Sequence, residues 1–377
     1  MSHFAVADSQ NRVSVYSLPE HVSDPPTSTT EITGIWPVPR PGSEWTVSVV
    51  DDSSRLEHRS GIGATEVPGS SNAPPALIGA RLAHYAAWSP SGERLSYVVP
   101  DGRALSLRTW VPGDTGFHAL VSAAPVFPAW VPGSNWLLCH HGPTLSAFDT
   151  SSSEQRILSA AASGFRTPAV SSDGSRIAWA EVSGGRVVVF VGSLTGGPEA
   201  VASFPGGVVL SFRPQTNDLH AAVASSPESG VFGEIVRIDS GGRPPQRILQ
   251  GPVVAYWWSP DGDKLATLHP TYSGDGRFQV RFYGPAGEFL GAMEPIIPSA
   301  DTATLVGFFD QYAVSHPCWS ADGRWFGIAG RRVSEGPHPS FSGGDPNSAF
   351  IWDTRAKVAP VAIPGGSLVV FERSAGK

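Results

Sequence analysis

The stretch that decides the fold is Trp258-Ser-Pro-Asp-Gly262-Asp-Lys-Leu-Ala-Thr267, an aromatic residue followed by a short turn and an apolar segment. Proline at the second turn position presets φ to roughly −65°, aspartate bonds back to nearby backbone amides, and glycine accepts the positive φ that closes the turn. The pattern therefore predicts a hairpin turn between a strand that ends in tryptophan and a second apolar strand.

The same pattern recurs along the chain. Close copies begin at Trp88, Val170 and Trp319, and weaker copies begin at Trp36, Trp130 and Phe212. Successive copies start 40 to 61 residues apart. A four-stranded propeller blade occupies ~40–50 residues, so the recurrence predicts an array of four-stranded antiparallel units, with strands A to D in each.

Composition agrees with an all-β chain. Between the turns, Arg277-Phe-Gln-Val-Arg-Phe282 alternates apolar and polar residues with the period of a half-buried strand, and helical periodicity is scarce. Charged residues make up 16% of the chain against a usual share of about 25%, and 42 Gly and 35 Pro argue against a helical bundle. The 12 Trp and 18 Phe supply enough apolar surface for a sizeable core.

The repeat resembles that of known propellers. The Trp-Ser-Pro-Asp-Gly copies are similar to the TolB-type propeller repeat, and Ile351-Trp352-Asp353 resembles the end of a WD-repeat strand. The resemblance implies a β-propeller over nearly the whole chain. It implies no single function, because such propellers serve many. It also implies that the D-to-A and B-to-C loops share one face of the ring. Binding usually takes place on that face or in the central channel.

The two ends of the chain supply one further unit. Phe4 to Asp8, Arg12 to Tyr16 and Thr30 to Thr33 read as strands B, C and D, and Ser367 to Glu372 reads as their strand A. A shared terminal blade would close the ring and remove exposed sheet edges. We therefore expect one propeller domain over residues 1–377, with eight blades favoured and seven as the alternative.

The net charge, the apolar stretches and the cysteine content indicate which partners and which cellular location to expect. The net charge is −7 without basic runs, so nucleic acid is not an expected partner. No apolar stretch approaches the roughly 20 residues of a membrane helix, and no secretory leader is visible, so no membrane association is expected. Only Cys139 and Cys318 are present, and no glycosylation signal occurs, which fits a cytosolic protein. We expect a monomer without a cofactor.

Enzyme and metal motifs are largely missing. There is no Gly-x-Ser-x-Gly elbow, phosphate-binding loop, His-Glu-x-x-His pair or calcium loop. Cys139-His140-His141 and His316-Pro-Cys318 together contain four potential zinc ligands. They lie four units apart, on opposite sides of an eightfold ring, so buried thiols and ordinary histidines are the preferred interpretation. We predict no catalytic residue and no metal site.

Long B-to-C loops are the main candidate for a binding surface. They span Ser225 to Gly233, His269 to Gly276 and Arg331 to Ser348. Tolerated insertions are the alternative. The binding candidates on this face are Tyr272, Arg331, Arg332, His338, Phe341 and Asp345.

The segment Pro295 to Gln311 is a second candidate. Its apolar side chains would either cap the core or contact a partner, and core packing is the preferred interpretation. These side chains are Leu305, Phe308 and Phe309.

Few polar side chains fall on the strands expected to line the central channel. One of these expected inner strands is Gln311 to Trp319. The channel candidates are Arg81, His84, Arg166 and His316. This scarcity favours a non-catalytic scaffold that binds a protein partner of unknown identity through loops on one face. The alternative is a stand-alone propeller enzyme, or a small-ligand or glycan binder, that uses channel residues such as His84 as an acid or base. Three or more convergent titratable groups in the channel would reverse this order.

Overall fold

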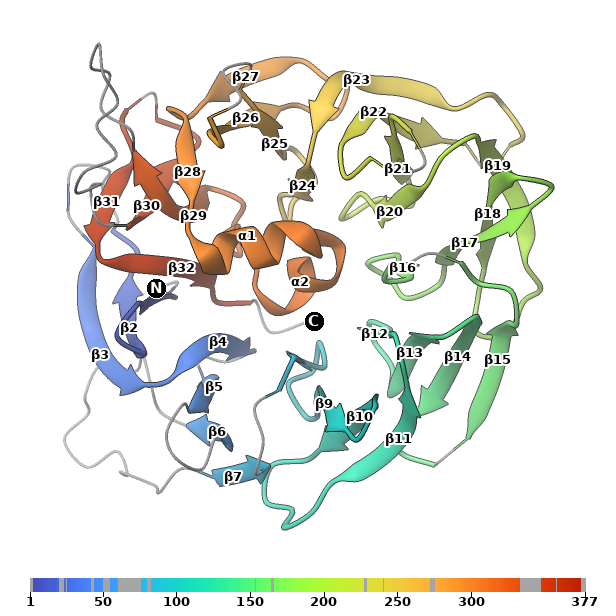
Figure 1. The fold of residues 1–377 in the computed structure, drawn as a ribbon, viewed down its shortest axis with the longest axis horizontal. Coiled ribbons are helices and arrows are strands. Elements are labelled where there is room, and N and C mark those ends of the chain that lie inside the picture. The colour runs from blue at the N-terminus through green and yellow to red at the C-terminus, as the bar shows by residue number, and fades with distance from the viewer. Residues whose placement is uncertain are drawn as a thin grey trace.

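The computed structural model describes residues 3–19, 24, 26–41, 44–49, 55–59, 76–79, 83–152, 154–163, 166–226, 229–239, 241–271, 275–332, 347–356 and 358–373. These residues form 32 strands and two helices. All strand pairs within the sheets are antiparallel. Figure 1 shows the sheets following one another around a central region, so the predicted propeller fold is confirmed.

Six sheets among the described residues have four strands each. The first contains β32 (Gly366–Phe371), β1 (His3–Asp8), β2 (Arg12–Ser17) and β3 (Thr27–Thr33). The second contains β4 (Ile35–Arg40), β5 (Glu44–Val49), β6 (Arg55–Arg59) and β7 (Ala76–Gly79). The third contains β8 (Tyr85–Trp88), β9 (Leu95–Asp101), β10 (Ala104–Trp110) and β11 (His118–Ala123).

The next three sheets follow the same order. They are β12 (Val126–Trp130), β13 (Trp136–His141), β14 (Thr144–Asp149) and β15 (Gln155–Ser159); β16 (Ala169–Val170), β17 (Ile177–Ser183), β18 (Arg186–Gly192) and β19 (Glu199–Phe204); and β20 (Val208–Phe212), β21 (Leu219–Ala224), β22 (Phe232–Ile238) and β23 (Gln246–Val253).

The remaining sheet has eight strands and includes two repeat units. It holds β24 (Ala255–Trp258), β25 (Leu265–Pro270), β26 (Phe278–Tyr283), β27 (Phe289–Ala292), β28 (Ile296–Pro298), β29 (Trp325–Arg332), β30 (Ser348–Asp353) and β31 (Val361–Pro364). β28 pairs with both β26 and β29 and so joins the two units. Eight blades result only if this sheet is divided at β28, and the blade count stays a prediction.

The first and last strands of the described chain lie side by side. β1 pairs with β2 on one side and with β32 on the other, and Phe4 is opposite Phe371. Both phenylalanine side chains are fully buried, and their rings are 5.6 Å apart. The terminal strands therefore share one sheet and one apolar cluster. That the chain forms a single domain stays a prediction.

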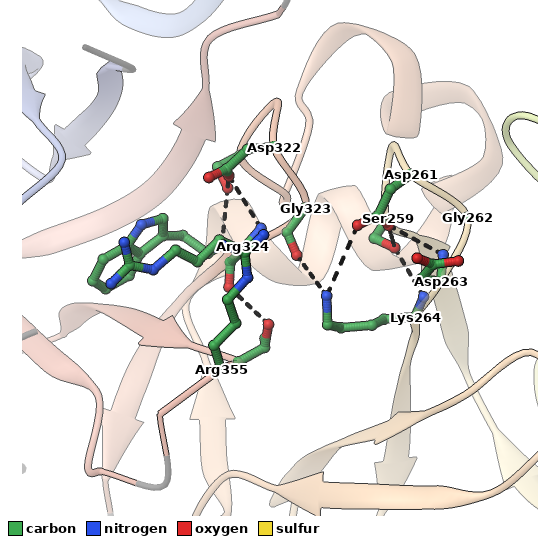
Figure 2. A network of polar contacts seen from close by, with 12 residues as sticks. Ser259, Asp261, Gly262, Asp263, Lys264, Asp322, Gly323, Arg324 and Arg355 are labelled. Carbon is green, nitrogen blue, oxygen red and sulfur yellow. Dashed lines mark hydrogen bonds and ion pairs between the residues drawn. The ribbon is translucent and has the colours of Figure 1, made fainter. Parts of the chain in front are cut away.

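The repeated turn is held by its serine and aspartate (Figure 2). The hydroxyl of Ser259 donates to Asp261 Oδ1 over 2.5 Å and accepts from the backbone N–H of Lys264 at 2.9 Å. Gly262 closes the turn at φ +74°, and a Cβ at this position would clash with the carbonyl oxygen of Pro214 in the preceding unit. Glycine is therefore required both for its backbone conformation and for the close approach.

Hydrogen bonds also tie most of the turns to a neighbouring unit. Basic side chains donate to a backbone carbonyl of the following turn: Lys264 to Gly323 (3.1 Å, Figure 2), Arg213 to Gly262 (2.7 Å), Arg176 to Asn217 (2.9 Å) and Arg40 to Gly92 (2.7 Å). The turns thus link successive sheets in addition to closing hairpins.

The tryptophans before the turns pack between sheets, as expected. Three of them are buried and donate their indole N–H to the preceding unit: Trp88 to Thr46 Oγ1 (3.0 Å), Trp130 to the Ala87 carbonyl (3.0 Å) and Trp319 to the Trp257 carbonyl (3.1 Å). A large apolar ring with one polar donor suits such a junction. Neither helix in the described part of the chain is long and apolar enough to cross a membrane.

Candidate functional site

Two short helices lie at the centre of the ring, in front of the sheets in Figure 1. They are α1 (Ala300–Gly307) and α2 (Phe309–Ser315), in the connection between β28 and β29. We call them the central helices. α1 begins at the N-cap Ser299, whose hydroxyl accepts from the N–H of Thr302 at 3.1 Å, and Asp301 follows in the first turn. An N-cap hydroxyl and an early acidic residue both favour a helix start.

The expectation of an inner strand over Gln311 to Trp319 is wrong, because α2 occupies these positions up to Ser315 and only an isolated bridge from Trp319 to Phe326 follows. Phe309, Tyr312 and His316 are buried and recur at intervals of three and four residues. This is the spacing of one helix face and not of a strand. Of the apolar residues that mark this segment, Leu305 and Phe309 pack in the core, whereas Phe308 is exposed.

Asp310 fastens α2 to the connection that precedes β16. Its carboxylate accepts from Arg166 Nη1 at 3.2 Å and from the backbone N–H of Thr167 at 2.9 Å. The side chain of Asp310 is only 6% exposed, whereas that of Arg166 is 32% exposed. Both carboxylate oxygens are therefore used in a contact between segments that lie more than 140 residues apart.

Tyr312 fastens the same helix to the residue that precedes β8, in a different sheet. Its hydroxyl donates to the backbone carbonyl of His84 at 3.1 Å, and its ring lies 5.4 Å from Trp36 and 5.8 Å from Tyr85. Burial raises the pKa of the Tyr312 hydroxyl above its ordinary value, so the group stays protonated and serves as a donor.

Phe309 packs against aromatic residues of β22 and β24, in two further sheets. Its ring centroid is 5.2 Å from that of Tyr256, 5.9 Å from that of Phe232 and 6.2 Å from that of Trp257. α2 thereby contacts inner strands β8, β12, β20 and β24. The helix is part of the core of the ring and does not lie loosely across it.

His316, a predicted channel candidate, is buried at the end of α2. Its Nδ1 is 2.8 Å from the Ser315 hydroxyl, and its ring meets Trp36 edge-on at 5.2 Å. Burial lowers the pKa of His316 to about 3. A general base works best when its pKa is close to the operating pH, so this histidine is poorly suited to acid–base chemistry near neutrality.

A polar cavity lies beside Arg166, between the inner ends of three sheets. His140 is 4% exposed, and its Nδ1 is 3.0 Å from the carbonyl oxygen of Arg166. A carbonyl only accepts, so Nδ1 carries the proton and Nε2 carries a lone pair. Nε2 and the hydroxyl of Thr167 are both buried and have no hydrogen-bond partner among the residues that the structure describes. The lining residues are His140, Leu145, Ala162, Ser163, Arg166, Thr167, Pro168, Trp179, Ala180, Val208 and Leu210.

Of the other predicted residues, only His84, Arg331 and Arg332 lie among those that the structure describes, and their side chains do not converge on the centre. His84 contributes its backbone carbonyl, and its side chain is exposed. Arg331 and Arg332 lie at the end of β29, where Arg332 stacks on Phe350 at 5.0 Å. The remaining candidates lie outside the described residues: Arg81, Tyr272, His338, Phe341 and Asp345.

Cys139 and Cys318 are buried, free thiols. Burial raises the pKa of Cys139 above its ordinary value and that of Cys318 to about 12, so both stay protonated. Within the part of the chain that the structure describes, no three His, Cys, Asp or Glu side chains are grouped so that they could hold a metal ion.

Sequence reasoning missed Asp310, Tyr312 and Thr167 and considered His140 only as a zinc ligand. The helical spacing of Phe309, Tyr312 and His316 was a usable signal for α2. No signal in the sequence joins Asp310 to Thr167, because that contact depends on how the ring closes.

No protein-family model and no curated protein sequence matches the chain. Solved structures do. The dihydro-heme d1 dehydrogenase NirN superposes with a TM-score of 0.63 at 14% identity, over 99% of this chain and 75% of NirN. An oligogalacturonate lyase from Vibrio parahaemolyticus gives 0.54 at 13% identity, over 86% of this chain and 85% of the lyase. TolB from Acinetobacter baumannii gives 0.45 at 16% identity, over 76% of this chain and 68% of TolB.

The chain thus has a propeller fold, and its likeness to the NirN and lyase structures is one of fold. At these identities the likeness carries no activity from one protein to another.

Proposed function

We propose that this protein is a non-catalytic scaffold that binds another protein through the face of the ring that carries the central helices. The observation that carries the proposal is that the polar groups at the centre are engaged in contacts within the protein. Asp310 and Arg166 pair with each other, Tyr312 bonds to the backbone at His84, and His316 is enclosed by aromatic rings. These groups stabilise the centre and leave little polar chemistry for a substrate.

The central helices also expose apolar side chains on this face. Phe308, between the two helices, is 44% exposed, and Val314 on α2 is 36% exposed. Phe308 lies 6.4 Å from the ring of Phe127 at an inner strand, so its position is defined by packing. Rigid apolar side chains surrounded by polar groups are the usual centre of a protein interface. The long B-to-C loops predicted to contribute to this face are part of the proposal, as is a cytosolic location.

The experiment is quantitative affinity purification from the native host with wild-type protein and two double variants. Phe308→Ser with Val314→Ser removes the apolar surface of the central helices. Phe289→Ser with Leu290→Ser is the matched control, because these residues are 61% and 51% exposed on the outer strand β27.

A protein that is recovered by wild type and by the β27 control, but at least ~tenfold less by the central variant, supports the proposal. A protein that is lost only with the β27 control places the interface elsewhere. Equal recovery by all three proteins removes the central helices from any interface. Circular dichroism of the variants checks that each is folded.

The sequence also suggested an alternative, a ligand site that uses polar groups of the channel. One place in the described part of the structure supports this alternative. That place is the cavity beside His140, where two buried polar atoms lack protein partners.

A further inference from the structure

We propose that the cavity between β13, β17 and β20 binds a hydroxyl group of a small neutral polyol or sugar. This site is separate from the protein-binding role of the central helices and does not depend on it. The proposal rests on the polar groups of the cavity, on their charge balance and on its size.

The first step is the hydrogen-bonding character of the site. His140 holds its proton on Nδ1 toward the Arg166 carbonyl, so Nε2 presents a fixed acceptor. The hydroxyl of Thr167, a second lining group, both donates and accepts. Both atoms are buried and unpaired with protein. A buried unsatisfied group is costly, and a ligand hydroxyl suits either group because it donates to the nitrogen of His140 or accepts from Thr167.

The second step is the charge of the site. Arg166 lines the cavity and is balanced by Asp310 at 3.2 Å. Asp310 uses both of its oxygens, on Arg166 and on Thr167. A guanidinium has five N–H donors, so the group that pairs with Asp310 also has donors for a second hydroxyl. The pair has no net charge, which favours a neutral ligand over an anion, since an anion would lose hydration without a free positive charge in return.

The third step is size. The centres of water-sized groups have about 20 Å³ available in the cavity, and the hollow together with the open space at its mouth measures about 350 Å³. One water-sized group fits inside, and the rest of a small ligand fits in the mouth. Leu145, Val208 and Leu210 line the apolar walls. Metal binding is disfavoured, because His140 has no second and third ligand among the described residues.

The test uses protein labelled with ¹⁵N at histidine, in which NMR detects the Nε2 of His140 directly. Glycerol is the minimal probe, 1,2-dimethoxyethane keeps two oxygens on adjacent carbons but has no donor, and lactate carries a charge. We expect glycerol to shift the Nε2 resonance saturably with a Kd on the order of 10 mM. Dimethoxyethane and lactate should bind at least ~tenfold more weakly.

Two variants test the role of Thr167. Thr167→Val has the same shape without the hydroxyl and keeps the backbone N–H that bonds to Asp310. It should weaken glycerol binding about tenfold, and Thr167→Ser should retain it. If Thr167→Val does not fold, the three probes on wild type still decide.

The proposal is overturned if glycerol at about 1 M leaves the Nε2 resonance unchanged, which is the result expected when a permanently held water satisfies both groups. It is also overturned if dimethoxyethane produces the same shift as glycerol, or if Thr167→Val binds glycerol as wild type does. Lactate binding as tight as that of glycerol would exclude the neutral class of ligand.

Discussion

The repeat turns and the centre around α2 both join neighbouring sheets, but they do so over very different sequence distances. In the turns, Ser259 bonds to groups two and five residues away, and a basic side chain then reaches the next turn. At the centre, Asp310 reaches back 144 residues to Arg166, and Tyr312 reaches back 228 residues to His84. The turns are local and repeated, whereas the centre is non-local and occurs once. Their dependence on pH and on mutation should differ accordingly.

The largest effect is expected from acid, which acts on the buried histidines before the turn carboxylates. His316 belongs to the centre, whereas His220 and His269 lie on β21 and β25. Burial lowers the pKa of His316 to about 3 and those of His220 and His269 to about 4, from 6.5 in the unfolded chain. Each folded value is depressed, so each histidine gains a proton on unfolding at acid pH. Their stability contribution is complete above pH 6.5 and falls below it, by about 1.4 kcal/mol per pH unit for each histidine.

At pH 4.5 the three histidines together should reduce the free energy of unfolding by on the order of 5–8 kcal/mol. The turn carboxylates respond later. The hydroxyl of Ser171 holds the pKa of Asp173 below its ordinary value of 3.8, so that contribution is lost only below about pH 4. Urea unfolding between pH 4.5 and 7 measures the slope. His316→Gln should reduce it, and His118→Gln, at an exposed position, should leave it unchanged. A flat profile in this range would contradict the assignment of buried neutral histidines.

The next largest effect is expected at the anchor of α2. Asp310→Ala leaves Arg166 and the N–H of Thr167 without their partner, and should reduce the free energy of unfolding by about 2–3 kcal/mol. Glu154→Ala is the matched control, because its ion pair with Arg156 is largely exposed and should cost about 0.5 kcal/mol or less. Chemical denaturation of both variants gives the comparison. Equal losses would show that the central pair is no stronger than a surface pair.

The two regions also differ in what the sequence reveals. The turns were predictable because their serine, aspartate and glycine act on neighbouring residues, so that residue order alone determines the contacts. The sheet architecture and the inner tryptophans followed from the same repeat. The centre was predictable only in part. Arg166 and His316 were identified as groups near the channel, but Asp310, which pairs with Arg166, and the helical form of α2 depend on closure of the ring.

Two turn glycines separate the effect of backbone strain from the effect of close contact with a neighbouring turn. Gly262 and Gly102 both have positive φ, but a Cβ at Gly262 would meet the carbonyl of Pro214, whereas a Cβ at Gly102 has open space around it. Gly102→Ala should cost about 1 kcal/mol from backbone strain alone. Gly262→Ala should cost about 2–3 kcal/mol, since the neighbouring turn must also move. Thermal unfolding of the two variants measures the difference. Equal losses of stability in the two variants would mean that the contact between neighbouring turns does not contribute to stability.

The smallest effect is expected from the side chain that links two turns. Lys264→Met removes the donor to the Gly323 carbonyl, and because other contacts join these sheets the loss should be only about 0.5–1 kcal/mol. Lys264→Arg should restore the link, because Arg176 stands at the same place after Gly174 and donates to Asn217 at 2.9 Å. Denaturant midpoints of both variants test this. A loss in Lys264→Arg as large as in Lys264→Met would show that the contact depends on the lysine itself and is not a general property of the repeat.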